Sequence, residues 1–286
     1  MPNIKDNVDQ LRIKNIKPNT AIGQHFLIDQ EIVNRLIGAT DITKDDIVIE
    51  VGAGTGIVTE KLIPTAKRIY AYEIDQQFAP YLNELKSKVN NLIIVWENIR
   101  QAELPAKYTK VVGNIPYHIS ESMLWKFRNE NFKTMVLITG KDFAVKLTAK
   151  IDDKNFCNLS VIFQAQFNIE LIEIIEKGHF YPCPPVASAL IKITPVTKEE
   201  LLKNIPHFIL NFIWNVKEMK LKNALREALI SYVRQKKNQQ LTKKQAKKIV
   251  DAFGLPKEEL NKIVDGGNSV LVAETLRGFY FEGLEE

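Results

Sequence analysis

The sequence predicts an α/β fold in which a doubly wound parallel sheet is followed by a small all-helical domain. Short apolar, β-branched runs alternate with helical stretches between residues 47 and 139, and the pattern is wholly helical after Thr197. Pro195 stands at the seam, so we place the domains at residues 1–196 and 197–286. Of the 286 residues, 45% are hydrophobic and 26% are charged, which excludes disordered and fibrous classes.

The predicted sheet begins with the apolar run Ile47–Val51, which stops at three closely spaced glycines. Such a run is typical of a buried parallel strand that turns tightly into a helix, here at residues 57–62. The alternation that follows indicates right-handed crossovers and a sheet covered on both faces. Further strands are predicted at residues 68–74, 92–96, 110–113 and 135–139, and helices at residues 78–88 and 120–128.

The pattern changes after Lys141. A helical stretch runs to Ala149, and apolar segments follow at residues 159–167, 169–175 and 187–193. We interpret the last two as candidate antiparallel strands that close one edge of the sheet. In the C-terminal part, apolar residues recur at helical spacing: Leu201, Ile205, Ile209, Phe212 and Ile213, and then Leu221, Ala224, Leu225, Ala228 and Leu229.

The sequence contains no membrane or export signal. No apolar stretch reaches the ~18 residues needed to cross a bilayer, and residues 1–10 mix charged and polar side chains. We therefore expect a cytoplasmic protein without a membrane partner. Cys157 and Cys183 are too few for a metal tetrad and indicate two free thiols, so no metal site is expected.

Positive charge is concentrated in one segment. Residues 217–248 contain eleven Lys or Arg and two acidic residues, a net charge of +9, whereas the whole chain carries +5 and the remainder therefore −4. Such a segment suits a nucleic-acid phosphate backbone, although a solvated helix face is an equal alternative. The candidate contacts with such a backbone are Lys220, Lys222, Arg226, Lys236 and Lys237.

A first candidate site is the glycine turn after Ile47–Val51. Gly52 and Gly54 leave room for a ligand to approach the backbone, and Glu73 ends the next predicted strand, where its carboxylate can accept both hydroxyls of a ribose. This combination indicates a nucleoside cofactor. The glycine spacing disfavours a dinucleotide site, and no Lys-Ser or Lys-Thr pair of a P-loop follows. The alternative is a glycine turn without a ligand.

A second candidate site is Asn114-Ile115-Pro116-Tyr117, just after the fourth strand. The carboxyl ends of the strands form the binding crevice of an open α/β sheet, so this tetrapeptide is expected to face the same cleft as Gly52 and Glu73. The Asn114 amide oxygen and a neighbouring carbonyl can accept hydrogen bonds from an exocyclic amine, while Tyr117 offers a ring for stacking. The alternative is a proline turn with a buried tyrosine.

Five motifs follow one another along the chain. They are Gly23-Gln24-His25-Phe26-Leu27, Glu50-Val51-Gly52-Ala53-Gly54-Thr55-Gly56, Glu73-Ile74-Asp75, Gly113 to Ser120, and Phe180 to Ala189. In this order they resemble the KsgA family of ribosomal RNA adenine dimethyltransferases, whose near relatives are the Erm resistance methyltransferases. The resemblance covers roughly residues 18–195. It implies a Rossmann-like methyltransferase domain with a helical C-terminal domain, and transfer of methyl groups from S-adenosylmethionine to N6 of adenosines.

The resemblance also implies roles for individual residues. His25 and Leu27 border the methionine end of the cofactor, Gly52, Gly54 and Asn114 line it, and Glu73 holds its ribose. Asn98 stands where the family usually carries an Asp that contacts the cofactor adenine, and Gly140 where relatives usually carry Gln. In the target half of the cleft, the resemblance implies that Asn114 and Tyr117 grip the target adenine and that Phe180 closes over its other face.

We therefore expect a monomeric enzyme that dimethylates adenosines of ribosomal RNA in a small ribosomal subunit or its precursor. A second hypothesis is Erm-like methylation of large-subunit RNA, against which the Asn223-Ala224-Leu225 match in the helical tail weighs. A third is a non-catalytic RNA-binding assembly or transcription factor. The changes at Asn98 and Gly140 favour that hypothesis, and the complete Asn114–Tyr117 motif weighs against it.

Overall fold

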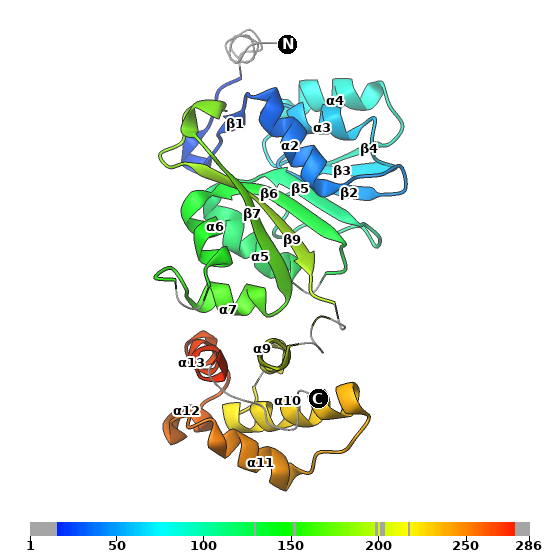
Figure 1. The fold of residues 1–286 in the computed structure, drawn as a ribbon. Helices are drawn as coiled ribbons and strands as arrows, with labels where there is room; N and C mark the ends of the chain where they lie inside the picture. The colour runs from blue at the N-terminus through cyan, green and yellow to red at the C-terminus, as the bar shows by residue number, and fades with distance from the viewer. Residues whose placement is uncertain are drawn as a thin grey trace. The chain divides into compact units, whose positions relative to one another are not determined.

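The computed structural model describes residues 16–128, 130–150, 153–197, 200, 204–216 and 218–277. The chain divides into two compact units (Figure 1). The first unit contains Met1–Ala144 and Ile169–Thr194, and the second contains residues 145–168 and Pro195–Glu286. The second boundary lies within two residues of the seam that we place after residue 196.

A seven-stranded sheet with the strand order β4-β3-β2-β5-β6-β9-β7 forms the centre of the first unit. The strands β4, β3, β2, β5 and β6 pair in parallel, whereas β9 pairs antiparallel with β6. The α/β fold class is therefore confirmed, and the predicted strands agree with the observed ones to within two residues. The bounds are β2 Ile47–Val51, β3 Arg68–Tyr72, β4 Leu92–Val95, β5 Lys110–Asn114, β6 Thr134–Gly140, β7 Phe167–Ile175 and β9 Ser188–Pro195.

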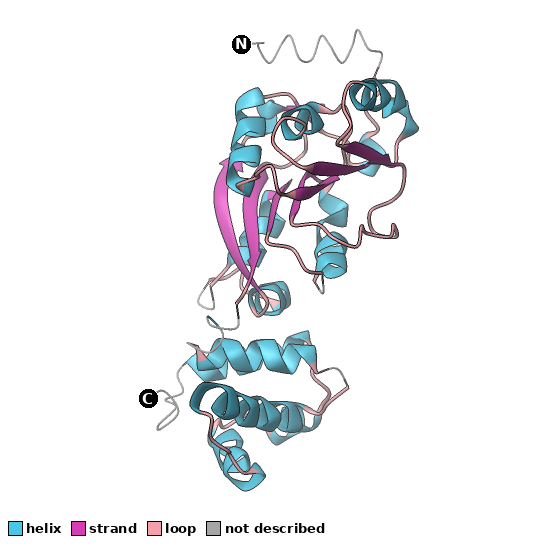
Figure 2. Cartoon of the chain, turned by 90° about the vertical axis from the view of Figure 1, so that its right-hand side faces the viewer, coloured by secondary structure: helices cyan, strands magenta, loops and turns pink. Residues whose placement is uncertain are grey.

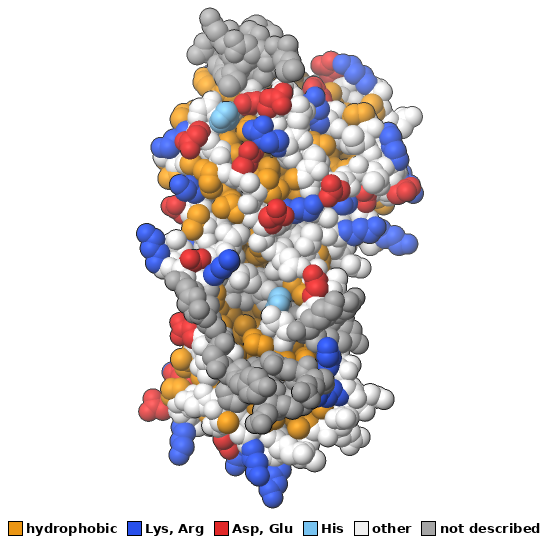
Figure 3. Space-filling model, viewed as in Figure 1, with side chains coloured by type: hydrophobic (Ala, Val, Ile, Leu, Met, Phe, Trp, Pro, Cys, Tyr) orange, Lys and Arg blue, Asp and Glu red, His pale blue; other side chains and the backbone are white. Residues whose placement is uncertain are grey.

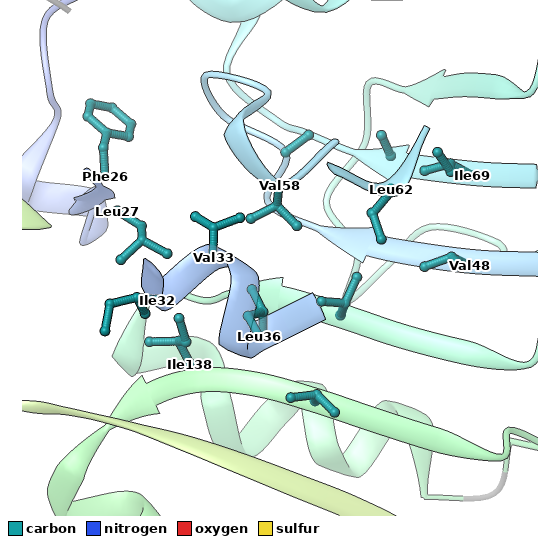
Figure 4. Packing of buried hydrophobic residues seen from close by; sticks show 14 of the residues in the cluster. Phe26, Leu27, Ile32, Val33, Leu36, Val48, Val58, Leu62, Ile69 and Ile138 are labelled. Carbon is teal, nitrogen blue, oxygen red and sulfur yellow. The ribbon is translucent and has the colours of Figure 1, made fainter. Parts of the chain in front are cut away.

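Helices flank the strands on both sides (Figure 2), as expected for crossovers that cover both faces of a sheet. Figure 4 shows Ile32, Val33 and Leu36 of one helix packed between Val58 and Ile138, and all five are at most 5% exposed. This apolar packing fixes the sheet and therefore the positions of its strand ends. The helices are α2 Gln30–Thr40, α3 Ile57–Leu62, α4 Ala79–Ser87, α5 Ser120–Phe127 and α6 Lys141–Thr148.

A short two-stranded sheet holds the N-terminal segment of the first unit. Strand β1 (Phe26–Leu27) pairs antiparallel with β8 (Phe180–Tyr181), and the His25 ring nitrogen Nδ1 lies 2.8 Å from the Pro182 carbonyl oxygen. We call residues 19–29 the N-terminal strap. Its C-terminal end is held by Asp29, whose carboxylate lies 2.7 Å from His179.

The second unit is helical. One face of α10 carries Ala224, Leu225, Ala228, Leu229 and Tyr232, all at most 2% exposed, so the predicted apolar spacing marks the core face. The N-terminus of α11 is fixed by a capping box between Thr242 and Gln245. The helices are α7 Asn158–Gln164, α9 Ile205–Asn215, α10 Leu221–Lys237, α11 Lys243–Ala252, α12 Lys257–Asn261 and α13 Gly266–Arg277.

The segment 145–168 belongs to the second unit, although we placed it in the first domain from the sequence. Its apolar run at residues 159–167 forms mostly helix α7, which packs against α9 and α13. The Asn211 amide also donates a hydrogen bond to the Ala165 carbonyl at 2.5 Å. The two compact units therefore differ here from the predicted domains, which have a single boundary after residue 196. Among the described helices, none is long and apolar enough to span a bilayer.

Candidate active site

A cavity opens at the carboxyl ends of the parallel strands in the first unit. It is lined by residues 22–26, 51–52, 72–74, 97–100 and 114–119. The strand order reverses between β2 and β5, because β3 lies on one side of β2 and β5 on the other. Ligands of open α/β sheets bind at such a switch point. Two of the predicted motifs, the glycine turn and Asn114–Tyr117, therefore face one another across one cleft.

The turn after β2 is held against the end of β3. The backbone N–H groups of Gly52 and Ala53 both donate to the Tyr72 carbonyl, at 2.9 and 3.1 Å. Gly52 has φ of 72° and Gly54 has φ of 49°, in the left-handed region that glycine adopts without steric cost. Gly52 lines the cavity. Gly54 does not line it, but its N–H donates a hydrogen bond to the Glu73 carboxylate, which does.

Glu73 is the buried acid of the cavity, with 7% of its surface exposed. Its Oε1 accepts the N–H groups of Ile74 and Asp75, each at 2.8 Å, and its Oε2 accepts that of Gly54 at 2.7 Å. Burial raises the pKa of this carboxyl, and the three backbone N–H groups act against that rise. A carboxylate offers about four lone-pair sites, so Oε2 keeps capacity for a ligand hydroxyl.

Glu50 is a second buried acid beneath the turn, and only 1% of its surface is exposed. Its Oε2 accepts the Thr59 hydroxyl at 2.7 Å, while its Oε1 is buried without a hydrogen-bond partner in the described structure. Burial, reinforced by the neighbouring Glu73 charge, raises the pKa of Glu50 to about 8. The folded protein therefore holds a protonated Glu50 at neutral pH.

We expect the free energy of unfolding to decrease as the pH rises from about 4.5 to about 8. The unfolded chain releases the Glu50 proton near its ordinary pKa of 4.5, whereas the folded chain keeps it to about 8. The folded state binds more protons over that window, so the loss is on the order of a few kcal/mol. Urea unfolding of wild type and Glu50→Gln across this window measures it.

Glu50→Gln should show a flatter decline, because the amide does not titrate. The matched control is Glu60→Gln, a change of the same kind at an exposed position of α3, which should retain the wild-type slope. Parallel curves for wild type and Glu50→Gln would remove Glu50 as the source of the pH dependence.

Asn114 is oriented by the N-terminal strap. Its amide Nδ2 donates to the His25 carbonyl at 2.9 Å, which leaves Oδ1 available as an acceptor in the cavity. The carbonyl of Pro116 accepts the Ile119 N–H at 3.1 Å, whereas the Ile115 carbonyl has no hydrogen-bond partner among the described residues. Each carbonyl has two lone pairs, and the Ile115 carbonyl is the one that no described residue occupies.

Tyr117 and His25 form an aromatic pair at the cavity. Their ring centroids lie 6.2 Å apart, with an interplanar angle of 25°. Both residues line the cavity. The rings offer a flat surface next to the Asn114 acceptor, which suits a planar base.

Asn98 also lines the cavity. Its Oδ1 accepts the backbone N–H of Arg100 at 3.1 Å and the Arg100 side-chain Nε at 3.4 Å. Its Nδ2 makes no hydrogen bond within the part of the chain that the structure describes. An amide can accept a hydrogen bond through Oδ1 or donate one through Nδ2. Because Oδ1 is occupied, the Asn98 side chain can donate through Nδ2 to a ring nitrogen of a ligand.

The structure does not bring every predicted residue to the cavity. Leu27 and Phe180 are each 3% exposed, pair with one another across β1 and β8, and belong to the hydrophobic core. Their predicted contacts with the cofactor and the target adenine stay predictions. His25, Gly52, Glu73, Asn98, Asn114 and Tyr117 all line the cavity.

Several cavity residues had no role in the sequence prediction. Arg100 lines the cavity two residues after Asn98. It closely follows the carboxyl end of β4, and this position in the sequence could have predicted that it lies at the cleft. Gln24 donates to the Asp75 carboxylate at 2.7 Å and so ties the strap to the end of β3. Within the described residues, no cluster of three or more His, Cys, Asp or Glu side chains could hold a metal ion.

The five candidate RNA contacts lie in the second unit, where Lys222 and Arg226 bond to neighbouring residues. Lys222 Nζ donates to the Asn261 side chain at 2.7 Å, and Arg226 donates to the Lys222 carbonyl and to the Asn223 side chain. Lys220 and Lys236 are exposed, and Lys237 is half-buried. Figure 3 shows Lys and Arg side chains gathered where α11 lies.

Two solved structures of methyltransferases share the fold of this chain. A crystal structure of a dimethyladenosine transferase from Plasmodium falciparum has the same fold, with a TM-score of 0.60 at 24% identity over 88% of this chain and 98% of that one. The 23S rRNA methyltransferase ErmE matches with a TM-score of 0.57 at 22% identity over 88% and 99%. At these identities the likeness concerns the fold alone.

The sequence comparisons define the family. The family model for ribosomal RNA adenine dimethylase matches residues 15–265. A probable ribosomal RNA small subunit methyltransferase A from Pyrococcus abyssi is 39% identical over 180 residues, 63% of this chain and 66% of that protein. One from Methanococcus maripaludis is 33% identical over 213 residues, 73% and 81% respectively. The chain belongs to the ribosomal RNA adenine dimethylase family.

Proposed function

We propose that this protein dimethylates N6 of adenosines in small-subunit ribosomal RNA, with S-adenosylmethionine as methyl donor. The observation that carries the proposal is the orientation of Asn114, whose Nδ2 is bound by the His25 carbonyl and whose Oδ1 is left as an acceptor. The relatives named as small subunit methyltransferase A support the choice of subunit. The ErmE structure shares only the fold and therefore does not favour the alternative of large-subunit RNA.

The residues around the glycine turn fit the cofactor. The remaining acceptor capacity of Glu73 Oε2 suits a ribose hydroxyl, and the Asn98 amide suits an adenine ring nitrogen. Gly52 has no side chain, so its backbone lines the cavity directly. A Cβ at this position would take up space next to the Asn114 carbonyl oxygen, at 3.7 Å. We place His25 at the methionine end. When bound, the cofactor supplies a methyl group on a positively charged sulfur.

The target adenine enters beside Asn114 in this proposal. Its N6 lone pair is delocalised into the ring and is a poor nucleophile. Hydrogen bonds from its two N–H groups to Asn114 Oδ1 and the Ile115 carbonyl favour a pyramidal nitrogen with the lone pair directed at the methyl group. Tyr117 stacks on the base. In the transfer, the bond between the methyl carbon and the sulfur would break as the N–C bond forms, so the positive charge would pass from sulfur to nitrogen. The nitrogen would then release a proton to solvent, so that positioning by these residues supplies the catalysis.

The test is to incubate the protein with labelled S-adenosylmethionine and undermethylated small or large ribosomal subunits, and to map the label. We expect N6,N6-dimethyladenosine in small-subunit RNA. Label in large-subunit RNA alone would contradict the proposal, and RNA binding without transfer would point to the non-catalytic alternative. In this proposal the protein acts in the cytoplasm and as a monomer.

We propose that the basic segment of the second unit contacts the RNA backbone. Lys236 and Lys237 end α10, Lys243 and Lys244 begin α11, and only residues 238–242 separate the two pairs. Lys236, Lys243 and Lys244 are exposed and Lys237 is half-buried. Their like charge suits phosphate contacts, which fix position without reading sequence.

Replacing Lys236, Lys237, Lys243 and Lys244 together by Gln should make subunit binding less dependent on salt. Each lost phosphate contact should reduce the slope of log K against log salt concentration by about 0.7 to 0.9. Filter binding across a salt series measures the slope. A matched variant changes four exposed lysines of the first unit, Lys44, Lys61, Lys67 and Lys86, and should keep the wild-type slope. Equal slopes for the two variants would place the RNA surface elsewhere.

A further inference from the structure

The side chain of Gln24 anchors the N-terminal strap to the end of β3. Its Nε2 donates to Asp75 Oδ2 at 2.7 Å, and its Oε1 accepts the backbone N–H of Asn19 at 2.8 Å. The first bond ties the strap to the residues that follow the sheet strand, and the second closes residues 19–24 into a loop. The strap is therefore fixed immediately before His25.

The partner of this anchor, Asp75, is itself firmly held. Its backbone N–H donates to Glu73 Oε1 at 2.8 Å, and its Oδ1 accepts the backbone N–H of Gln77 at 3.0 Å. Burial acts to raise the pKa of Asp75, but the hydrogen bonds from Gln24 and Gln77 outweigh it, so the pKa lies below its ordinary value. Gln24 therefore donates to an ionised carboxylate, and such bonds are stronger than neutral ones.

The residue before Gln24 lies directly against the loop that follows Asn114. A Cβ built on Gly23 would lie 3.2 Å from Pro116 Cβ and 3.2 Å from His118 Nδ1, and the φ of Gly23 is 72°. Glycine tolerates both this close approach and the left-handed backbone. The strap therefore packs on the base-binding motif at the point where Gln24 anchors it.

The His25 carbonyl, which orients Asn114, is held from both sides. After it, β1 pairs with β8, and the His25 ring nitrogen Nδ1 lies 2.8 Å from the Pro182 carbonyl oxygen. Before it, Gln24 is bonded to Asp75. The direction of a carbonyl depends on the two soft dihedral angles of the backbone around it. Loss of the anchor on one side therefore lets the His25 carbonyl turn away from Asn114 Nδ2.

We infer that Gln24 is a positioning residue for methyl transfer, because it keeps the His25 carbonyl in place and thereby holds Asn114 Oδ1 toward the target adenine. The inference rests on the proposed function, since it needs Asn114 as the acceptor of the adenine N6 group. Gln24 lines the cavity, but its amide is bonded to Asp75 and Asn19. It acts through the strap and not on the substrate.

The first test compares Gln24→Met with wild type, because methionine has a side chain of similar length and forms neither hydrogen bond. In single-turnover reactions on undermethylated small subunits at saturating cofactor, we expect transfer to slow about tenfold. The affinity for S-adenosylmethionine, measured by calorimetric titration, should stay within a few fold, because Glu73 and Asn98 are unchanged.

The matched control is Gln77→Met, which removes another amide from the same Asp75 carboxylate but lies outside the strap. It should transfer at the wild-type rate. A normal rate for Gln24→Met at saturating cofactor would overturn the inference, and so would an equal loss in the control. If wild type itself produces no methylated adenosine, the proposed function fails and the inference fails with it.

A double variant tests whether Gln24 acts through Asn114. In the Asn114→Ala protein, the added Gln24→Met change should slow the residual transfer by no more than about twofold, because the group that Gln24 positions is already absent. Transfer of a labelled methyl group makes the residual rate measurable. A further tenfold loss would show that Gln24 acts by another route and would overturn the inference.

An exchange of charge between the two partners keeps the inference testable if a thermal melt shows that Gln24→Met is unfolded. Gln24→Glu places two carboxylates at the contact with Asp75, so transfer should fall because like charges repel. Adding Asp75→Asn supplies an amide that donates to the introduced carboxylate, and transfer should return to within about twofold of wild type. A double variant no faster than Gln24→Glu would contradict the inference.

Discussion

Replacing Asn114 by alanine is expected to reduce methyl transfer by on the order of a thousandfold while cofactor affinity stays within a few fold. The alanine removes Oδ1, the acceptor that the His25 carbonyl orients by binding Nδ2 at 2.9 Å. The cofactor half of the cleft keeps its acceptor at Glu73 and its amide at Asn98. Single-turnover transfer and calorimetric titration of S-adenosylmethionine measure the two quantities separately.

The matched control for this change is Asn83→Ala, at an exposed position of α4, which should transfer at the wild-type rate. Asn114→Ala also releases one bond to the N-terminal strap, and a thermal melt reports whether the strap stays in place. An Asn114→Ala protein with normal activity would exclude Asn114 from the mechanism.

Replacing Glu73 by glutamine is expected to weaken cofactor binding by on the order of a hundredfold. The carboxylate accepts three backbone N–H groups and keeps capacity for a hydroxyl, whereas an amide has a single acceptor oxygen. Its NH₂ group would face a backbone donor at the turn, so the glycine turn loses its anchor as well. Calorimetric titration measures the affinity. The methyl-transfer rate of Glu73→Gln should lie closer to the wild-type rate at saturating cofactor than at low cofactor.

Glu103→Gln is the matched control for this change, because Glu103 is exposed and lies outside the cavity lining. Its cofactor affinity should equal that of wild type. If Glu73→Gln bound the cofactor within threefold of wild type, the ribose contact that we propose for Glu73 would be wrong.

The strand ends of the first unit could be predicted because their signals are local. Ile47–Val51 is a continuous apolar run that stops at Gly52, and Asn114 follows another such run, so both fall at the carboxyl edge of a parallel sheet. Topology alone then brings Gly52, Glu73 and Asn114 to one cleft. This is why five of the predicted site residues line the observed cavity, namely Gly52, Glu73, Asn98, Asn114 and Tyr117.

The strap could not be predicted in the same way. Strands β1 and β8 have two residues each and lie about 150 residues apart in the sequence, too short for any periodicity to appear. The place of α7 in the second unit likewise depends on packing against α9 and α13, which no local pattern records. Phe180, expected over the target base, is an apolar side chain that the core accommodates equally well.

The orientation of Asn114 also lies beyond sequence reasoning. The motif predicts an amide at the cleft but does not say which of its two polar atoms faces the ligand. The bond from Nδ2 to the His25 carbonyl decides this, and it depends on the strap crossing the end of β5. A residue type can therefore be predicted from spacing, whereas its hydrogen-bonding role depends on a distant segment.

The most direct test of the account is a structure of the protein determined with S-adenosylmethionine. The account predicts the ribose hydroxyls within hydrogen-bonding distance of Glu73, the adenine ring beside Asn98, and the methyl group directed at the space between Asn114 Oδ1 and Tyr117. An adenosyl group bound away from the end of β3, or a cavity left empty at saturating cofactor, would contradict it.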